Sequence, residues 1–159
     1  MYMERARSES EVRPAEIGAA WSQVAGFVSA VETRLGKWVA DRRGIGLTEY
    51  RALIVLEQAP DRELRVSDLA ARIGLNQSSV TRMLGRLEQK GFTYRDTCPD
   101  DGRGVYAVIT DEGADLVGVL RVEYENQVRD LFEKVGDDFP GLDLRGLRAA
   151  LDTIRALLA

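Results

Sequence analysis

Histidine is absent from this chain, and cysteine occurs only once, at Cys98. The absence of histidine removes the commonest general base and the commonest metal ligand in proteins. No glycine-rich phosphate loop follows a strand, and no serine or cysteine has an evident base partner. We therefore expect no enzyme, no catalytic residues, no metal site and no cofactor. A hard cation held by carboxylates alone is the one metal site that this composition leaves open.

The chain also lacks long hydrophobic runs. No stretch approaches eighteen consecutive apolar residues, and the first residues, MYMERARSESEVRP, are charged without an apolar segment. This pattern predicts neither a signal peptide nor a membrane span. A single cysteine also excludes an internal disulfide. We therefore expect a cytoplasmic protein. The 159 residues, 45% of them hydrophobic, are enough for one core. We expect a flexible tail at residues 1–13 and a single domain at residues 14–159.

Two short helices joined by a tight turn are predicted in the middle of the chain, at residues 67–73 (SDLAARI) and 78–91 (SSVTRMLGRLEQKG). The turn contains Gly74, which suits a left-handed helix end, and Asn76, a preferred N-cap. On the second helix, four apolar residues recur at helical spacing and form one stripe: Val80, Met83, Leu84 and Leu87. This arrangement is typical of a helix-turn-helix that reads DNA.

The face opposite this stripe carries polar and basic side chains. Hydroxyl and amide groups near a helix N-terminus can bond phosphate oxygens or base edges. Arg82 and Arg86 are long enough for a bidentate contact with guanine or for a phosphate clamp. The candidate DNA-binding residues here are Asn76, Gln77, Ser78, Ser79, Thr81, Arg82 and Arg86. The alternative interpretation is an amphipathic core helix with a solvated polar face.

Two short strands are predicted next, at residues 92–95 and 105–109, around the loop DTCPDDGRG. A hairpin in this position makes the unit a winged helix-turn-helix. Arg103, near the hairpin tip, can enter a narrow A·T minor groove. Asp101 can hold Arg95 or Arg103 through a charge-assisted hydrogen bond. We therefore add Arg95, Asp101 and Arg103 to the DNA-binding candidates, the alternative being an ordinary solvated turn.

The distribution of charge permits this interpretation although the net charge is −4. Between Arg72 and Arg95, five basic side chains stand against the single acid Glu88, whereas residues 111–159 hold eleven acidic and six basic ones. Attraction to DNA depends on the field at the contact surface more than on the charge of the whole chain. An acidic body behind a basic reading head is compatible with DNA binding and should weaken non-specific affinity.

Four parts of the sequence resemble the MarR family of bacterial winged helix-turn-helix transcriptional regulators. They are residues 75–91, Arg95, residues 101–103 (DGR) and residues 109–113 (ITDEG). In that family the wing carries Asp-x-Arg, followed by a strand and a Leu-Thr-x-x-Gly-like helix start; here Ile109 replaces the leucine. The resemblance implies a mainly α fold with a small β-hairpin wing. It also implies a dimer base formed by the first, fifth and sixth helices, and a ligand pocket bounded by the first, second and fifth.

Helical patterns flank the reading head on both sides, and we expect capping residues at three helix starts. Thr48 is expected to cap a helix that runs through Gln58, Ser67 to cap the next one, and Thr110 with Asp111 to cap a long helix from Glu112. The terminal helices are apolar enough to need a partner surface, and a twofold dimer supplies one. Helix-turn-helix dimers read two half-sites roughly 34–36 Å apart.

We accordingly expect a homodimer in which residues about 47–110 bind DNA and residues about 14–43 and 111–159 form the dimerisation helices. The alternative is that the terminal helices pack only on their own domain. Candidate ligand-binding residues are apolar or cationic enough for an aromatic anion: Trp21, Trp38, Tyr50 and Arg51. Each of them is alternatively plain core or surface, and a regulator that binds DNA constitutively also remains open.

Taken together, the sequence predicts a sequence-specific regulator of transcription that binds double-stranded DNA, most simply a repressor released by a small aromatic or amphipathic ligand. Its operator is expected to be pseudo-palindromic. A competing hypothesis is a winged-helix module that binds another protein and not DNA. A further alternative is a redox switch at Cys98, because an exposed cysteine of low pKa can be oxidised. No second cysteine could resolve such a product, so an incidental surface cysteine is the simpler interpretation.

Overall fold

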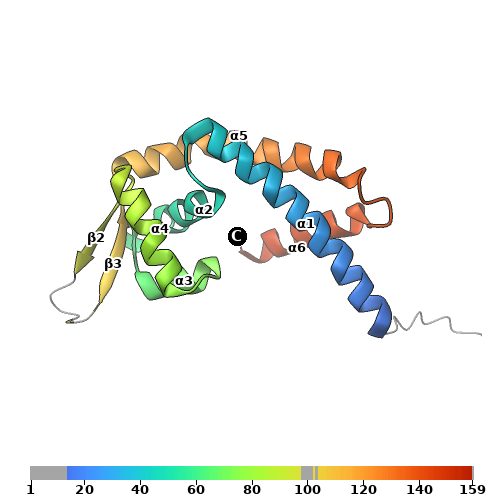
Figure 1. Ribbon diagram of the computed structural model, residues 1–159, viewed down its shortest axis with the longest axis horizontal. Helices are drawn as coiled ribbons and strands as arrows, with labels where there is room; N and C mark the ends of the chain where they lie inside the picture. Colours follow the sequence, from blue (N-terminus) through green and yellow to red (C-terminus); the bar gives the residue numbers. More distant parts are fainter. Residues whose placement is uncertain (1–13, 98–101, 103, 159) are drawn as a thin grey trace, which may run out of the picture. The chain divides into compact units, whose positions relative to one another are not determined.

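A computed structural model describes residues 14–97, 102 and 104–158 (Figure 1). These residues form helices and a small sheet in the following order: α1 (Pro14–Arg43), α2 (Leu47–Glu57), a 3-10 turn η1 (Pro60–Arg62), β1 (Glu63–Arg65), α3 (Val66–Ile73), α4 (Gln77–Gln89), β2 (Thr93–Thr97), β3 (Val105–Ile109), α5 (Asp111–Gly136) and α6 (Leu144–Leu158). The predicted fold class, mainly α with a small β-hairpin wing, is confirmed. Within the described residues, no helix is both long and apolar enough to span a membrane.

The chain divides into two compact units. The larger unit, Glu32–Leu131, contains residues 32–43 of α1, the helices α2, α3 and α4, the sheet and most of α5. The smaller unit consists of the described parts of Met1–Val31 and Phe132–Ala159. Its core includes Phe27 of α1, whose ring meets Phe132 and Phe139 edge-on, with centroids 5.1 and 5.8 Å away. The smaller unit therefore has apolar contacts of its own.

The helix-turn-helix forms as the spacing predicts. All four residues of the apolar stripe on α4 are buried. Gly74 ends α3 with φ 70° and ψ 32°, the left-handed conformation expected of it. The Asn76 side chain caps α4 by accepting a hydrogen bond from the Ser79 N–H at 2.8 Å. The turn residues Gly74 and Asn76 thus supply the two local signals that separate the helices.

The sheet has one strand more than the sequence predicted. Its order is β1-β3-β2, antiparallel throughout, so the hairpin of β2 and β3 is extended by the three residues of β1. Only Leu64 of β1 is buried, opposite Ala107 of β3. A strand this short shows no alternation that would distinguish it from a loop. Strands β2 and β3 form the wing and come directly after α4 in the chain (Figure 1).

Two of the predicted helix caps are wrong. Helix α2 begins at Leu47, one residue before the predicted Thr48 cap, and Gly46 is its N-cap. The buried Leu47 extends the helix, and Glu49 provides the acceptor for the Gly46 N–H at 3.0 Å. Ser67 does not cap α3, because β1 leads straight into the helix at Val66.

The third predicted cap forms. The Thr110 hydroxyl accepts a hydrogen bond from the Gly113 N–H at 3.1 Å and donates one to the Gly91 carbonyl at 2.7 Å. Asp111 is the first residue of α5 and not part of its cap. Thr110 therefore joins the start of α5 to Gly91, two residues after the end of α4.

Candidate nucleic-acid interface

The outer face of α4 carries the predicted DNA-binding side chains. Gln77, Ser78, Thr81, Arg82 and Arg86 are exposed, and Ser79 is half-buried. Because the apolar stripe of the same helix faces the core, these polar side chains necessarily line the opposite face and its flanks. The structure thus brings together on one helix the residues that the sequence grouped by spacing.

Some of these groups already make local hydrogen bonds. The Asn76 carboxamide oxygen accepts from the Ser79 N–H and from the Ser78 hydroxyl, each at 2.8 Å. The Thr81 hydroxyl donates to the Gln77 carbonyl one turn earlier, at 2.9 Å. Asn76 therefore positions the start of the helix, while Ser78 and Thr81 keep only their acceptor lone pairs for a ligand.

Arg82 is differently placed. Within the part of the chain that the structure describes, no carboxylate or carbonyl pairs with its guanidinium, and the side chain is exposed. Since an unpaired guanidinium keeps all five N–H donors for an incoming ligand, Arg82 is the residue of this face best prepared for a bidentate contact.

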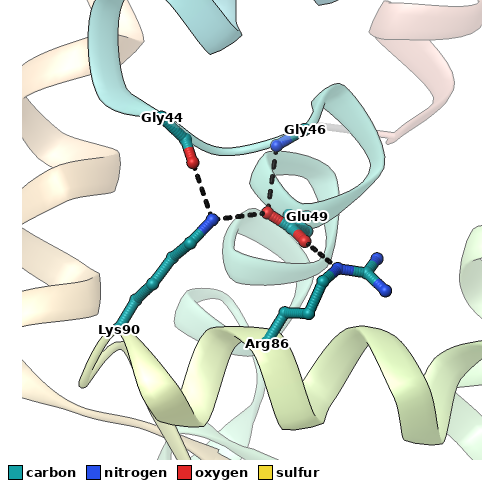
Figure 2. Close-up of polar contacts among 5 residues, drawn as sticks. All are labelled: Gly44, Gly46, Glu49, Arg86 and Lys90. Carbon is teal, nitrogen blue, oxygen red and sulfur yellow. Dashed lines mark hydrogen bonds and ion pairs between the residues drawn. The ribbon is translucent and has the colours of Figure 1, made fainter.

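Arg86 belongs to an ion-pair cluster that sequence reasoning missed. Its Nε atom lies 2.7 Å from Oε1 of Glu49 on α2, and Nζ of Lys90 lies 3.4 Å from Oε2 of the same carboxylate (Figure 2). Lys90 also donates to the Gly44 carbonyl at 2.6 Å, just after α1 ends. We call Glu49, Arg86 and Lys90 the Glu49 cluster. It joins the turn between α1 and α2 to α4.

Glu49 is the centre of this cluster and is only 4% exposed. Burial raises the pKa of its carboxyl. Hydrogen bonds from Arg86 and from the Gly46 N–H, together with the charge of Lys90, outweigh that effect and lower the pKa below its usual value. Glu49 is therefore a carboxylate held between two cations. One sequence signal pointed to it, because a glutamate three residues after an N-cap is the acceptor of a capping box.

At the base of the wing, Arg95 has a partner other than those expected for it. Its Nε and Nη2 atoms donate to the two carboxylate oxygens of Glu88 on α4, both at 2.7 Å. The hydrogen bonds and the charge of Glu88 raise the pKa of Arg95. Three residues of the sequence predictions lie outside the described residues: Asp101, Arg103 and Cys98.

The four ligand-binding candidates are differently exposed and paired. Tyr50 is 1% exposed and packs on Tyr124 with ring centroids 5.0 Å apart, and burial raises its pKa to about 12. Arg51 forms two hydrogen bonds with Glu32, at 2.6 and 2.7 Å. The remaining candidates differ again: Trp38 lies under the Arg42 guanidinium at 5.3 Å, and Trp21, in the smaller unit, is 69% exposed.

Helices α3 and α4, the tight turn between them and the hairpin of β2 and β3 that follows define a winged helix-turn-helix domain. Residues 45–105 match the model of the MarR family.

Relatives in sequence are regulators of transcription. The organic hydroperoxide resistance transcriptional regulator of Bacillus subtilis is 29% identical over 122 residues, which are 77% of this chain and 78% of that protein. The transcriptional repressor MprA of Escherichia coli is 28% identical over 75 residues, 47% of this chain and 43% of MprA. This chain thus spans less than half the length of MprA. Neither relative is named as an enzyme.

Solved structures share the fold. The MarR family regulator Sco3205 of Streptomyces coelicolor, crystallised in complex with DNA, has a TM-score of 0.73 and 24% identity, covering 96% of this chain and 91% of its own. AbsC, a MarR family regulator of the same organism, has a TM-score of 0.68 and 22% identity, covering 96% and 99%. At these identities, the likeness establishes the fold alone.

Proposed function

We propose that this protein regulates transcription by binding specific sequences in double-stranded DNA, with α4 in the major groove. The observation that carries the proposal is the outer face of α4, where Arg82 stands exposed without a partner among the described residues. The family match adds support, since Sco3205 was crystallised with DNA. An acidic chain of net charge −4 attracts DNA only through such a local surface. Binding to DNA, and not catalysis, is the proposed activity.

Within this proposal the residues have distinct roles. Gln77, Ser79 and Arg82 meet base edges or nearby phosphates, since the side chains of these three have no hydrogen-bond partner within the described part of the chain. Asn76, Ser78 and Thr81 shape the helix start and offer acceptor oxygens. In the wing, Arg103 enters the minor groove or contacts the backbone, and Arg95 and Asp101 are the other DNA-binding residues of the proposal.

We further propose that the protein acts as a homodimer through residues about 14–43 and 111–159, with residues about 47–110 binding DNA. In the smaller unit, large apolar side chains stand exposed on two helices: Ile17 and Trp21 of α1, and Leu151, Ile154 and Leu157 of α6. Exposed apolar groups in such number favour burial against a second copy. A twofold dimer would then present two copies of α4 to a pseudo-palindromic operator.

Repression is the simplest mode of action, because a dimer seated on a promoter excludes other proteins, and the relative MprA is named as a repressor. A small aromatic or amphipathic effector would release the DNA, and the protein would work in the cytoplasm, where bacterial DNA lies. Trp21, Trp38, Tyr50 and Arg51 remain the proposed effector residues.

Selection of bound duplexes from a random pool, followed by mobility shifts at two salt concentrations, tests this function. We expect one enriched motif, and we expect Arg82→Ala to weaken binding to it by about tenfold or more, as removal of a bidentate hydrogen bond to a base does. Arg129→Ala is the control, because Arg129 is exposed on α5 and the described residues give it no partner. Enrichment of no sequence would overturn the proposal.

A further inference from the structure

A cleft of about 350 Å³ opens beside α4 in the larger unit. It lies between the start of α2 and one flank of α4, and its lining residues are Thr48, Leu75, Ser79, Arg82, Met83 and Arg86. On α4, Ser79, Arg82 and Arg86 are spaced by three and four residues, so they share one flank of the helix. Two guanidinium groups and two hydroxyls thus converge on this cleft, and its described lining contains no carboxylate.

The Glu49 cluster leaves the binding end of Arg86 available. Glu49 accepts from Nε of Arg86, and the two terminal nitrogens of the guanidinium are directed away from that carboxylate (Figure 2). Among the described residues, those terminal nitrogens have no hydrogen-bond acceptor. Since Glu49 carries one negative charge and pairs with both Arg86 and Lys90, the cluster keeps a net positive charge. The cleft therefore presents cationic hydrogen-bond donors to a ligand.

We propose that this cleft binds a phosphate group of the DNA backbone and that Glu49 is the positioning residue that aims Arg86 at it. The inference rests on the proposed function. A guanidinium bonds phosphate oxygens with two parallel N–H donors, and the hydroxyls of Thr48 and Ser79 add neutral donors. Phosphate fits better than a base, because Thr48 of α2 lines the cleft, which therefore lies on the flank of α4 that faces α2. Phosphate contacts of this kind fix the register of a protein on the duplex.

Glu49 contributes through orientation. Its carboxylate is buried and fixed by the Gly46 N–H, so it holds the Arg86 side chain in one conformation before DNA arrives. A donor that is already oriented loses less conformational entropy on binding. Charge alone predicts the opposite effect of this residue, because an acid beside the DNA repels phosphates. Removal of Glu49 therefore distinguishes orientation from charge.

The first experiment compares Arg86→Gln with the control Arg129→Gln, which removes an equal charge from an exposed position on α5. The probes are the duplex selected with the wild-type protein and a scrambled duplex. We expect Arg86→Gln to weaken binding to both probes by the same factor, about tenfold, as removal of a charged hydrogen bond does. We also expect the log–log salt slope to fall by about 0.9 for each phosphate that the variant no longer neutralises.

A scan with neutral methylphosphonate groups locates the phosphate. We expect one position in each half-site at which the neutral group weakens wild-type binding and leaves Arg86→Gln unaffected. Binding of Arg86→Gln equal to that of Arg129→Gln would overturn the phosphate site, as would weakening confined to the selected duplex, which marks a base contact. Failure of the wild-type protein to bind any duplex would overturn the proposed function instead.

The second experiment tests Glu49→Gln against Asp68→Asn, an equal change of charge at an exposed position on α3. We expect Glu49→Gln to bind DNA more weakly than Asp68→Asn and with a lower salt slope, although both variants gain positive charge. In the Arg86→Gln background, Glu49→Gln should weaken binding no further, because both residues act on the same phosphate. Binding by Glu49→Gln as tight as that by Asp68→Asn would overturn the positioning role. The Arg86→Gln comparison remains decisive if Glu49→Gln does not fold.

Discussion

The guanidinium of Arg95 in strand β2 donates to both carboxylate oxygens of Glu88 on α4, each at 2.7 Å. This pair joins the wing to α4, because Glu88 lies seven residues before Arg95 in the chain. It also neutralises one of the five basic side chains that the sequence places between Arg72 and Arg95. In the unbound protein, the positive charge of residues 72–95 therefore comes chiefly from Arg72, from Arg82 and from the Glu49 cluster.

Glu88→Gln should strengthen binding to non-specific duplex. The substitution removes an acid beside α4 and frees Arg95 to meet a phosphate, so we expect tighter binding and a steeper salt dependence. The free energy of unfolding should fall by less than about 1 kcal/mol, because the pair is partly exposed. Fluorescence anisotropy and urea unfolding measure the two effects. Glu112→Gln is the control for charge, and equal DNA affinity of the two variants would show that Arg95 is not released toward the DNA.

Gly113→Ala should destabilise the fold. A Cβ at Gly113 would collide with the Phe92 carbonyl oxygen and lie 2.8 Å from Cγ1 of Ile109, at the junction of the sheet with α5. We expect the free energy of unfolding to fall by about 1–3 kcal/mol, which is typical of overpacking. Gly118→Ala is the matched control in the same helix, since nothing lies within 4 Å of its Cβ position. It should stabilise the protein by up to about 1 kcal/mol. Equal stability of the two variants in urea unfolding would contradict this packing.

Glu49 should make stability depend on acidic pH. Its pKa is lowered in the folded protein from an ordinary value of 4.5, so its ion pairs contribute fully at pH values above 4.5. That contribution is lost as the pH falls through the lower folded value. We expect the wild-type protein to be more stable than Glu49→Gln at pH 7, and the difference to shrink as the pH falls below 4.5. Urea unfolding of both proteins at several pH values measures this. A difference independent of pH would rule out the titration of Glu49 as its source.

Ile154→Lys should convert the proposed dimer into a monomer. Ile154 is 51% exposed on α6 in the single chain, and a lysine there would bury a charge if a second copy covers this face. Light scattering should give half the mass with unchanged helical content by circular dichroism. Asp152→Lys, two residues away at a charged position of the same helix, should remain dimeric. A mass equal to that of the wild-type protein would place the dimer interface elsewhere.

Local signals in the sequence predicted the helix-turn-helix well. The apolar stripe of α4, the left-handed Gly74 and the Asn76 cap all act within one or two helical turns, so their spacing alone identifies them. Strand β3 begins and ends at the predicted residues, Val105 and Ile109. These elements owe their positions to neighbours in the chain.

Contacts between residues far apart in the chain were not predicted. Arg86 and Glu49 are 37 positions apart, and no pattern in the sequence says which carboxylate an arginine on α4 will meet. Strand β1 exists because Leu64 pairs with Ala107, more than forty residues later. The Thr48 cap was predicted from residue preference, and tertiary burial of Leu47 together with Glu49 moved the helix start. Long-range pairing decided each of these features.

The most direct test of the proposed function is the affinity of the wild-type protein for its selected duplex, measured by mobility shift at two salt concentrations with non-specific competitor. We expect a discrete complex that resists the competitor and weakens steeply with salt, with a log–log slope of about −0.9 for each phosphate neutralised. Selection that enriches no sequence, or binding that does not change with salt, would contradict the assignment of α4 as a DNA-reading helix.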